Sequence, residues 1–312
     1  MRYFVTGGAG FIGSHLVDRL VNMGAVTVYD NLSSGKKEFI EQHLGRKDFQ
    51  FAQADLLEFN TLKEVMRGHD IIFHMAANPE ARAGIKDTDL DLKQGTTATY
   101  NILEAMRIND IKKLVFASSS TVYGETPAEP VPEDYGPLLP ISLYGASKLA
   151  CEGLISAFCH LFNMQAWIFR FANVVGSRTT HGVIFDFINK LRQNPKELEI
   201  LGDGTQEKPY IHTEDCVDGL LHGFQHSNNQ VNVFNLGCSS TTKVSIIAQM
   251  LAEEMGLPDV KFKYTGGNRG WPGDAPQVRF NISKMGKLGW KPKYTSDEAV
   301  RKAIKDILGK SG

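Results

Sequence analysis

The sequence predicts an α/β fold with a doubly wound parallel sheet, followed by a smaller α/β part. Short apolar segments alternate with helical patterns in the first half of the chain, as in a parallel sheet that helices cover on both faces. These segments lack strict polar alternation, which strands buried on both faces do not need. After about residue 171 this alternation of strand and helix patterns is no longer regular. Proline and glycine become frequent there, as in Gly202-Asp203-Gly204 and from Gly266 to Pro276.

Apolar residues at strand or helix spacing define the individual elements. The predicted strands are Tyr3–Val5, Val26–Tyr29, Phe49–Ala52, Ile71–Met75, Leu114–Ala117, Ala166–Phe169 and Val231–Leu236. The predicted helices are Ser14–Met23, Gly95–Asn109, Tyr144–Phe162, Thr242–Met255 and Ser296–Leu308.

The change in the sequence pattern near residue 171 predicts two domains of unequal size. The larger comprises residues 1–170, to which residues 210–237 return, and the smaller comprises residues 171–209 and 238–312. A chain of 312 residues is long enough for this division. We expect the smaller domain to hold the substrate.

Composition indicates an ordinary soluble globular protein, with 42% hydrophobic and 22% charged residues. The net charge of -1 gives no basic bias toward nucleic acid or an anionic membrane. The four cysteines are widely spaced without a C-x-x-C pair, so we expect no metal site, buried thiols and a reducing, cytoplasmic location. A predicted strand begins within two residues of Met1 and no apolar run reaches about 18 residues, so neither a signal peptide nor a membrane span is expected.

The segment Thr6-Gly7-Gly8-Ala9-Gly10-Phe11-Ile12-Gly13 joins the first predicted strand to the first helix. Its glycines permit a tight turn, close approach to a pyrophosphate, and packing of the helix on the strand. The helix N-terminus would carry the pyrophosphate charge. Because strand, turn and helix follow in this order, the segment predicts a dinucleotide-binding Rossmann domain rather than a glycine-rich turn without a ligand.

Asp30 ends the second predicted strand, 17 residues after Gly13. A carboxylate there accepts both hydroxyls of an adenosine ribose and repels a 2′-phosphate, which favours NAD over NADP. Asp55 could reach the adenine amino group, although a helix N-cap is nearly as good an explanation. The predicted cofactor-binding residues are Gly7, Gly10, Phe11, Ile12, Gly13, Asp30, Asn31, Ser33, Ser34, Gly35, Asp55, Leu56, Ala76, Ala77, Tyr144 and Lys148.

Candidate catalytic residues are Ser119, Tyr144 and Lys148. Tyr144 and Lys148 are four apart on a predicted helix and therefore share one face. A tyrosine with an ordinary pKa of about 10 is a poor base at neutral pH. A nearby ammonium and a positive nicotinamide both favour the phenolate, so Lys148 would lower the pKa of Tyr144. Ser119 could hydrogen-bond the same substrate oxygen.

Motifs over nearly the whole chain resemble those of the extended short-chain dehydrogenase/reductases, and within them the UDP-galactose (UDP-glucose) 4-epimerases. They are, in order, TGGAGFIGSH, YDNLSSG, HMAAN, SSSTVYG, YGASK, RFANVVG and RGWPGD. The resemblance implies that a proton passes from the sugar 4-hydroxyl to Tyr144 and a hydride to NAD. The 4-keto sugar then turns and receives the hydride on its other face. It also implies a homodimer through helices at about residues 95–109 and 144–160, where apolar residues are Ile102, Leu103, Met106, Leu149, Leu154 and Ile155.

Ser120 and Thr121 occupy the positions where the family's dehydratases have Asp and Glu. Hydroxyl groups cannot do acid–base work there at neutral pH, so this resemblance favours a 4-epimerase. A 4-reductase, which would consume added cofactor, and a dehydratase remain alternatives, as does a non-catalytic NAD-binding module.

The resemblance also implies the residues that bind a UDP-sugar. They are Ser118, Ser119, Ser120, Asn173, Gly182, Val183, Leu201, Lys208, Arg269, Asp274 and Val278. Lys208 replaces an arginine of many relatives, and Gly95 replaces an asparagine on the cofactor side. The small Val278 stands where a bulky tyrosine restricts relatives to glucose and galactose, so N-acetylated sugars are expected to enter as well. For Asp274 a turn residue is the alternative role.

Overall fold

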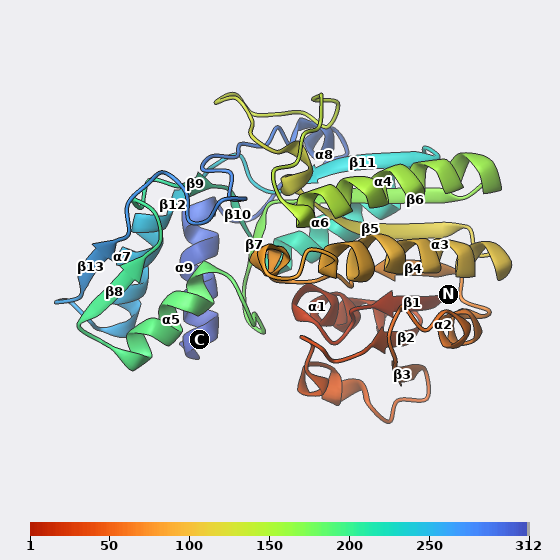
Figure 1. Cartoon of the computed structure of the whole chain (residues 1–312). Helices are drawn as coiled ribbons and strands as arrows, with labels where there is room; N and C mark the ends of the chain where they lie inside the picture. Colours follow the sequence, from red (N-terminus) through yellow and green to blue (C-terminus); the bar gives the residue numbers. More distant parts are fainter. Residues whose placement is uncertain (311–312) are drawn as a thin grey trace.

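The computed structural model describes residues 1–310 and has a parallel sheet of seven strands at its centre, in the order β11-β6-β5-β4-β1-β2-β3 (Figure 1). These strands are β1 Arg2–Thr6, β2 Ala25–Asp30, β3 Phe49–Gln53, β4 Ile71–His74, β5 Lys113–Ser119, β6 Gln165–Phe171 and β11 Val231–Leu236. The strand order reverses between β1 and β4. At such a switch point the loops that leave the two carboxyl ends diverge and form a crevice for a ligand.

Helices cover both faces of the sheet because successive side chains of a strand point to opposite sides. On β1, Val5 packs in a cluster with α1 and α6, whereas Phe4 packs in a second cluster with α2, α3 and α4. These helices are α1 Phe11–Leu20, α6 Thr213–His226, α2 Phe59–Met66, α3 Ala98–Ile108 and α4 Leu143–Phe162. The predicted doubly wound α/β class is thereby confirmed.

The predicted strands of the large sheet all occur, and the differences lie in the helices. The first helix begins at Phe11, because the glycine turn ends at Gly10, which serves as its N-cap. The helix predicted from Gly95 begins with a π-helical turn, Leu92–Thr97. Helices α2 and α6 were not predicted, nor were α5 Val183–Gln193 and α8 Ser283–Lys287. Residues 242–243 pair as β12 with β9 instead of starting a helix.

The smaller part of the chain lies at one end of the sheet (Figure 1). Its helices α5, α7 and α9 share an apolar cluster with β8. The elements are β7 Asn173–Val175, α5 Val183–Gln193, β8 Glu197–Ile200, β9 Glu207–Lys208, β10 Tyr210–His212, β12 Thr242–Lys243, α7 Val244–Met255, β13 Lys261–Tyr264, α8 Ser283–Lys287 and α9 Ser296–Leu308. The domain boundaries stay a prediction. Val278, Phe280, Met285 and Trp290 pack in the cluster of the large sheet.

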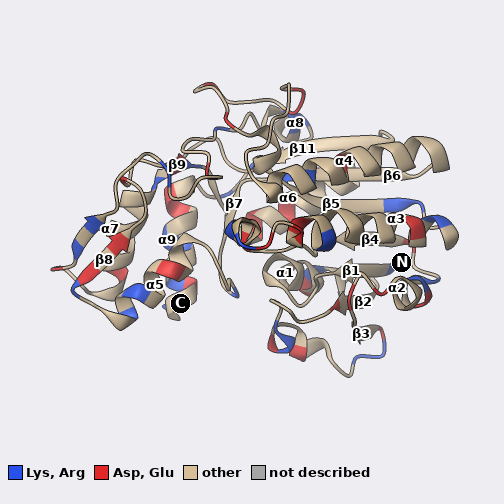
Figure 2. Cartoon of the chain, viewed as in Figure 1, with Lys and Arg blue, Asp and Glu red and all other residues tan. Residues whose placement is uncertain are grey.

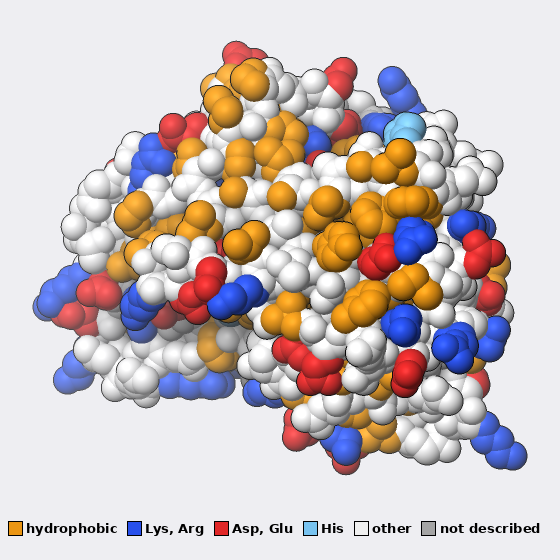
Figure 3. Space-filling model, turned by 45° about the vertical axis from the view of Figure 1, so that its right-hand side comes forward, with side chains coloured by type: hydrophobic (Ala, Val, Ile, Leu, Met, Phe, Trp, Pro, Cys, Tyr) orange, Lys and Arg blue, Asp and Glu red, His pale blue; other side chains and the backbone are white. Residues whose placement is uncertain are grey.

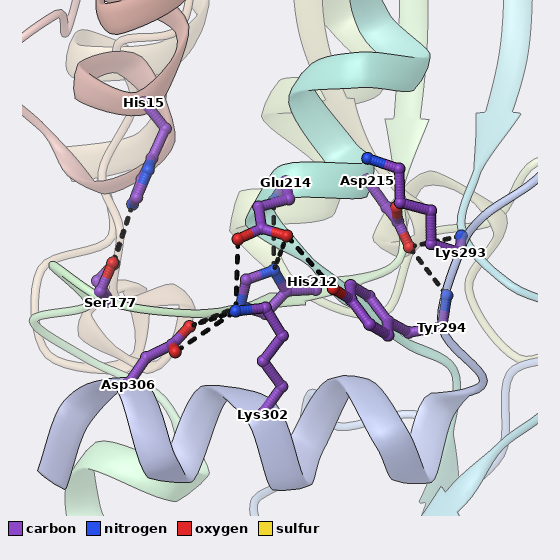
Figure 4. Close-up of polar contacts among 9 residues, drawn as sticks. All are labelled: His15, Ser177, His212, Glu214, Asp215, Lys293, Tyr294, Lys302 and Asp306. Carbon is purple, nitrogen blue, oxygen red and sulfur yellow. Dashed lines mark hydrogen bonds and ion pairs between the residues drawn. The ribbon is translucent and has the colours of Figure 1, made fainter. Parts of the chain in front are cut away.

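Polar contacts tie the smaller part to α1 and α6 (Figure 4). His15 Nε2 on α1 donates to the Ser177 carbonyl, 3.1 Å away, in the loop after β7. His212 Nδ1 accepts from the Glu214 amide, so its Nε2 donates to Asp306 Oδ2 on α9 at 2.9 Å. Asp215 accepts from the backbone amides of Lys293 and Tyr294. These contacts join α9, the segment before it and the loop after β7 to α1 and to the start of α6.

Several expectations from composition can be compared with the structure. The four cysteines are buried and free. Within residues 1–310 no helix has the length and apolar character that crossing a membrane would need. Lysine, arginine, aspartate and glutamate are interspersed along both parts of the chain (Figure 2), in line with a net charge of -1.

The chain leaves β5 through a sharp turn that ends at Gly124. This residue has φ +69°, and a Cβ there would lie 1.9 Å from the Leu139 carbonyl oxygen. We expect Gly124→Ala to lower the free energy of unfolding by about 1–3 kcal/mol, the cost of a strained left-handed residue. Urea denaturation measures it. Gly286→Ala in α8 is the matched control, since its Cβ would meet nothing within 4 Å. Equal midpoints for the two variants would contradict the prediction.

Candidate active site

A cavity of about 860 Å³ opens at the carboxyl edge of the sheet, between the large sheet and the smaller part. Its lining comes from the glycine turn, the loops after β2, β4 and β5, the first turn of α4, and the loops around α5 and β9. This volume is near the upper end of the range for small-molecule sites, about 300–1,000 Å³. The cavity therefore has room for an extended ligand or for two ligands side by side.

The glycine turn packs so tightly that side chains are excluded from it. A Cβ at Gly13 would lie 2.0 Å from the Gly7 carbonyl oxygen, and a Cβ at Gly7 would lie 2.7 Å from the Ala76 backbone. Gly7 also has φ +66°. Gly7, Gly10, Phe11, Ile12 and Gly13 all line the cavity, with the N-terminus of α1 directed at it. Backbone amides at a helix N-terminus suit a pyrophosphate, so the turn fits a dinucleotide.

Asp30 lies at the far end of the glycine turn, at the end of β2. Its Oδ2 accepts from the Ala9 amide at 3.0 Å and its Oδ1 from the Leu32 amide at 2.8 Å. Burial raises the pKa of Asp30, and the two amide hydrogen bonds oppose this shift. Asn31, Ser33 and Ser34 line the cavity beside it, as predicted for a ribose pocket. Asp30 thus also holds the turn in place.

Two predicted cofactor residues, Gly35 and Asp55, do not line the cavity. Gly35 packs under the site, where a Cβ would lie 2.9 Å from the Ala9 carbonyl oxygen. Asp55 accepts from the Asn31 side chain and the Leu57 amide, both at 2.8 Å. Asp55 does not cap α2, which begins only at Phe59, and its contact with the adenine amino group stays a prediction. The remaining residues of this group, Leu56, Ala76 and Ala77, do line the cavity.

Ser119, Tyr144 and Lys148 meet at the centre of the cavity. Ser142 caps α4 by accepting from the Gly145 amide, which places Tyr144 in the first turn and Lys148 one turn farther. The buried Lys148 Nζ donates to the Ala117 carbonyl at 2.6 Å and lies 5.7 Å from the centre of the Tyr144 ring. Ser119 is hydrogen-bonded to Tyr144. The three side chains predicted to be catalytic are therefore brought together.

Burial dominates the ionisation of this group. It raises the pKa of Tyr144 to about 12, with the Asp91 carboxylate adding to the shift and the Ser119 hydrogen bond opposing it. It lowers the pKa of Lys148 to about 8, against the influence of Cys151, Glu152 and Asp91. The lower pKa of Tyr144 was expected from Lys148 together with a positive nicotinamide, and this stays a prediction. A further positive charge beside the phenol would be needed to bring the pKa down.

The other hydroxyls of the β5 end differ in their orientation. Ser118 lines the cavity, but its hydroxyl donates to Glu152 Oε1 at 2.5 Å, so its contact with a substrate stays a prediction. Thr121 donates from its amide and its hydroxyl to Ser119 Oγ. Ser120 and Thr121 line the cavity. No carboxylate stands at these two positions.

The predicted substrate residues gather on the opposite side of the cavity, with one exception. Asn173, Gly182, Val183, Leu201, Lys208, Asp274 and Val278 line it. Lys208 is ion-paired with Asp274. Asp274 also accepts from the Gly270 amide at 3.3 Å, so the carboxylate shapes its own turn. Arg269 is outside the lining and is paired with Glu125, which does not line the cavity either.

Several lining residues were missed by sequence reasoning. Glu80 and Arg82 form an ion pair at 3.0 Å in the loop after β4. Gln94 lines the cavity next to Gly95, the position singled out from the sequence. A Cβ at Gly95 would lie 2.1 Å from Ser147 Oγ, so no side chain fits there. The π-helical turn over Leu92–Thr97 changes which residue faces the cavity, and no helical period could have predicted it.

Within the part of the chain that the structure describes, no group of three or more His, Cys, Asp or Glu side chains lies in a geometry that could hold a metal ion.

Comparison with known proteins gives consistent matches over the full length. Residues 3–237 match the NAD dependent epimerase/dehydratase family. The UDP-glucose 4-epimerase of Mycolicibacterium smegmatis is 30% identical, with 100% of both chains covered. A crystal structure of a UDP-galactose 4-epimerase is 39% identical with a TM-score of 0.89 and covers 100% of both chains. The UDP-glucuronic acid 4-epimerase of Bacillus cereus, in complex with UDP-glucuronic acid and NAD, is 28% identical with a TM-score of 0.90 and 99% coverage of each chain.

The glycine turn yields a direct test of dinucleotide binding. In Gly13→Ala the new methyl group would displace the Gly7 carbonyl and open the turn. We expect the affinity for NAD to fall at least about tenfold, equivalent to about 1.4 kcal/mol. Titration of the two apoproteins by calorimetry measures it, with Gly286→Ala as the control. Wild-type affinity in Gly13→Ala would show that the dinucleotide does not depend on this turn.

Proposed function

The chain belongs to the NAD-dependent epimerase/dehydratase family, and on this premise we propose that it is a UDP-hexose 4-epimerase acting on UDP-glucose and UDP-galactose. The observation that carries the proposal is the cluster of Ser119, Tyr144 and Lys148 in a cavity whose β5 end has no carboxylate at positions 120 and 121. This set can move one proton at one hydroxyl and has no acid–base pair for an elimination.

In the proposed reaction Tyr144 accepts the proton of the sugar 4-hydroxyl and later returns it. Ser119 hydrogen-bonds the same oxygen and holds it against Tyr144. Bound NAD supplies the carbon that takes up a hydride and gives it back, and its positive charge favours the phenolate. Lys148, anchored on the Ala117 carbonyl, keeps an ammonium beside the phenol. Asn173, Lys208 and the N-terminus of α5 would hold the diphosphate and uridine, so that the sugar itself is free to turn.

A neutral hexose fits the charges of the cavity better than a hexuronate. Among the described residues the lining has four carboxylates, Asp30, Glu80, Asp186 and Asp274, and three cationic side chains, Arg82, Lys148 and Lys208. Arg82 and Lys208 are already paired with Glu80 and Asp274. A sugar carboxylate would add negative charge to this surplus, and like charges at close range are unfavourable. This favours UDP-glucose and UDP-galactose over UDP-glucuronate.

The size of residue 278 favours N-acetylated sugars as additional substrates. Val278 lines the cavity and packs with the core of the large sheet, which holds its backbone in place. A valine leaves open the volume that a tyrosine ring would occupy. We infer that UDP-N-acetylglucosamine and UDP-N-acetylgalactosamine are also interconverted.

We further infer a homodimer through α3 and α4, although not through all the residues first named for it. Ile102, Leu103, Met106 and Ile155 are fully buried in the core and cannot meet a partner. Tyr100, Ile108 and Leu161 are instead 46%, 48% and 73% exposed on these helices. Hydrophobic side chains gather on the face that carries α3 and α4 (Figure 3). Exposed apolar side chains that gather on one face are typical of an interface.

The first experiment is proton NMR of UDP-galactose and of UDP-N-acetylgalactosamine with purified protein and no added cofactor. Conversion of UDP-galactose would support 4-epimerisation with retained NAD. Conversion only after NAD(P)H is added, with net consumption of the cofactor, would favour a 4-reductase. Loss of the 6-hydroxyl would favour a dehydratase. The alternative of a non-catalytic module predicts no conversion of any nucleotide sugar.

Tyr144→Phe tests the proposed base. We expect turnover of UDP-galactose to fall by about 10²–10⁴-fold, the range for loss of a general acid–base group. The NAD content should stay at the wild-type level, because the phenol oxygen is lost without a change in packing. Coupled kinetics and extraction of the cofactor measure the two quantities. Turnover close to wild type would exclude Tyr144 as the base.

Val278→Tyr tests the sugar pocket. The ring would clash with an N-acetyl group, so we expect the ratio of UDP-N-acetylgalactosamine to UDP-galactose kcat/KM to fall at least about tenfold. Val278→Ala is the control and should keep or raise this ratio. An unchanged ratio in Val278→Tyr would mean that residue 278 does not select the sugar.

A further inference from the structure

Three consecutive residues at the end of β5 are each held by a residue of α4. The Ala117 carbonyl accepts from Lys148 Nζ at 2.6 Å, the Ser118 hydroxyl donates to Glu152 Oε1 at 2.5 Å, and Ser119 is hydrogen-bonded to Tyr144. Tyr144, Lys148 and Glu152 are spaced by four residues and therefore lie along one face of the helix. Two of these contacts belong to the proposed catalytic group, and the third joins Ser118 to Glu152, which is not among the residues that line the cavity.

Glu152 is held from a second strand as well. Arg170 on β6 pairs with Ser118 in the parallel register, and its guanidinium donates to both carboxylate oxygens of Glu152, from Nη2 at 2.7 Å and from Nε at 3.0 Å. The side chains of Arg170 and Glu152 are only 6% and 9% exposed. Such a fork-to-fork pair fixes the carboxylate in distance and in orientation.

The same guanidinium also anchors the turn after β5. Its Nη1 donates to the Tyr123 hydroxyl and to the Glu133 carbonyl, both at 2.9 Å. Tyr123 in turn donates to Asn235 Oδ1 on β11 at 2.6 Å. Glu152 is therefore attached to a rigid group of strands, and not to a side chain that could follow a movement of α4.

We propose that Glu152 is a positioning residue. Its contacts with Ser118 and Arg170 fix the position of α4 along β5. They thereby set the distances of Tyr144 from Ser119 and of Lys148 from Ala117. The kinetic part of this inference rests on the proposed function. A misplacement of about 1 Å at a reacting group can cost up to about 10²-fold in rate. Stability alone is a poor explanation for the network, because buried ion pairs often add little to it compared with apolar packing.

The test is a double-mutant cycle of Ser118→Ala and Glu152→Gln. Ser118→Ala removes one contact and leaves the ion pair, and Glu152→Gln keeps the volume but removes the charge. Cys159→Ala is the control, since this buried residue is on the same helix but away from the end of β5. The measurements are kcat and KM for UDP-galactose, NAD content, thermal unfolding, and amide exchange by mass spectrometry over residues 113–119 and 143–152.

We expect each single substitution to lower kcat about tenfold, with KM and NAD content within about twofold of wild type. Because both act through one contact, the double variant should be no slower than the slower single variant. Amide exchange over residues 113–119 and 143–152 should be faster in both single variants than in Cys159→Ala, with the same unfolding temperature in all three. Unchanged kcat in both single variants, or effects that multiply in the double variant, would overturn the inference.

Failure of the proposed function would be recognised separately. If the wild-type protein and Cys159→Ala convert no UDP-hexose, the 4-epimerase proposal falls and the exchange measurement decides alone. Faster exchange at both segments in Ser118→Ala and Glu152→Gln would then support the positioning role, and exchange equal to that of Cys159→Ala would overturn it.

Discussion

Burial of the central sheet on both faces is the constraint on which the rest of this structure depends. Seven parallel strands lie between two layers of helices, so polar side chains can reach a ligand only where the strands end. The strand order reverses between β1 and β4, and the glycine turn and the loop after β4 separate at that point. The cavity, the glycine turn and the β5 hydroxyls are therefore at one edge, and the smaller part closes that edge from outside.

Ion pairs between residues that line the cavity determine which of its charges are available to a ligand. Two of its cations are already paired, Arg82 with Glu80 and Lys208 with Asp274. If the ligand is a diphosphate, as proposed, it would compete with these carboxylates, and a ligand with further negative charge would be disfavoured. Burial also disfavours the charged forms of Lys148 and Tyr144, because it lowers the pKa of Lys148 and raises the pKa of Tyr144. Their catalytic state then depends on the charge that a ligand brings.

Much of the fold could be predicted because its signals are local. Val5, Phe73 and Val115 lie in short apolar runs, and Gly7, Gly10 and Gly13 follow the first of them at a spacing that has a steric cause. The predicted site residues largely line the cavity for the same reason. The partners of Ser118 and Asp55 could not be predicted, because Glu152 and Asn31, to which their side chains are hydrogen-bonded, are far away in the sequence. Gly95 was singled out where Gln94 faces the cavity, since a π-helical turn breaks the helical period.

The sequence by itself determined the fold class, the glycine turn, and the residue types that can carry out proton and hydride chemistry. Each of these depends on neighbours in the chain, whose spacing is visible in the sequence. Only the tertiary structure decided which hydroxyls face the cavity, which cations are already paired, and how α4 is fixed against β5. Those features arise from contacts between residues of different elements, such as Ser118 on β5, Glu152 on α4 and Arg170 on β6. Their distances follow from the packing of the whole sheet and its helices, and no local pattern contains them.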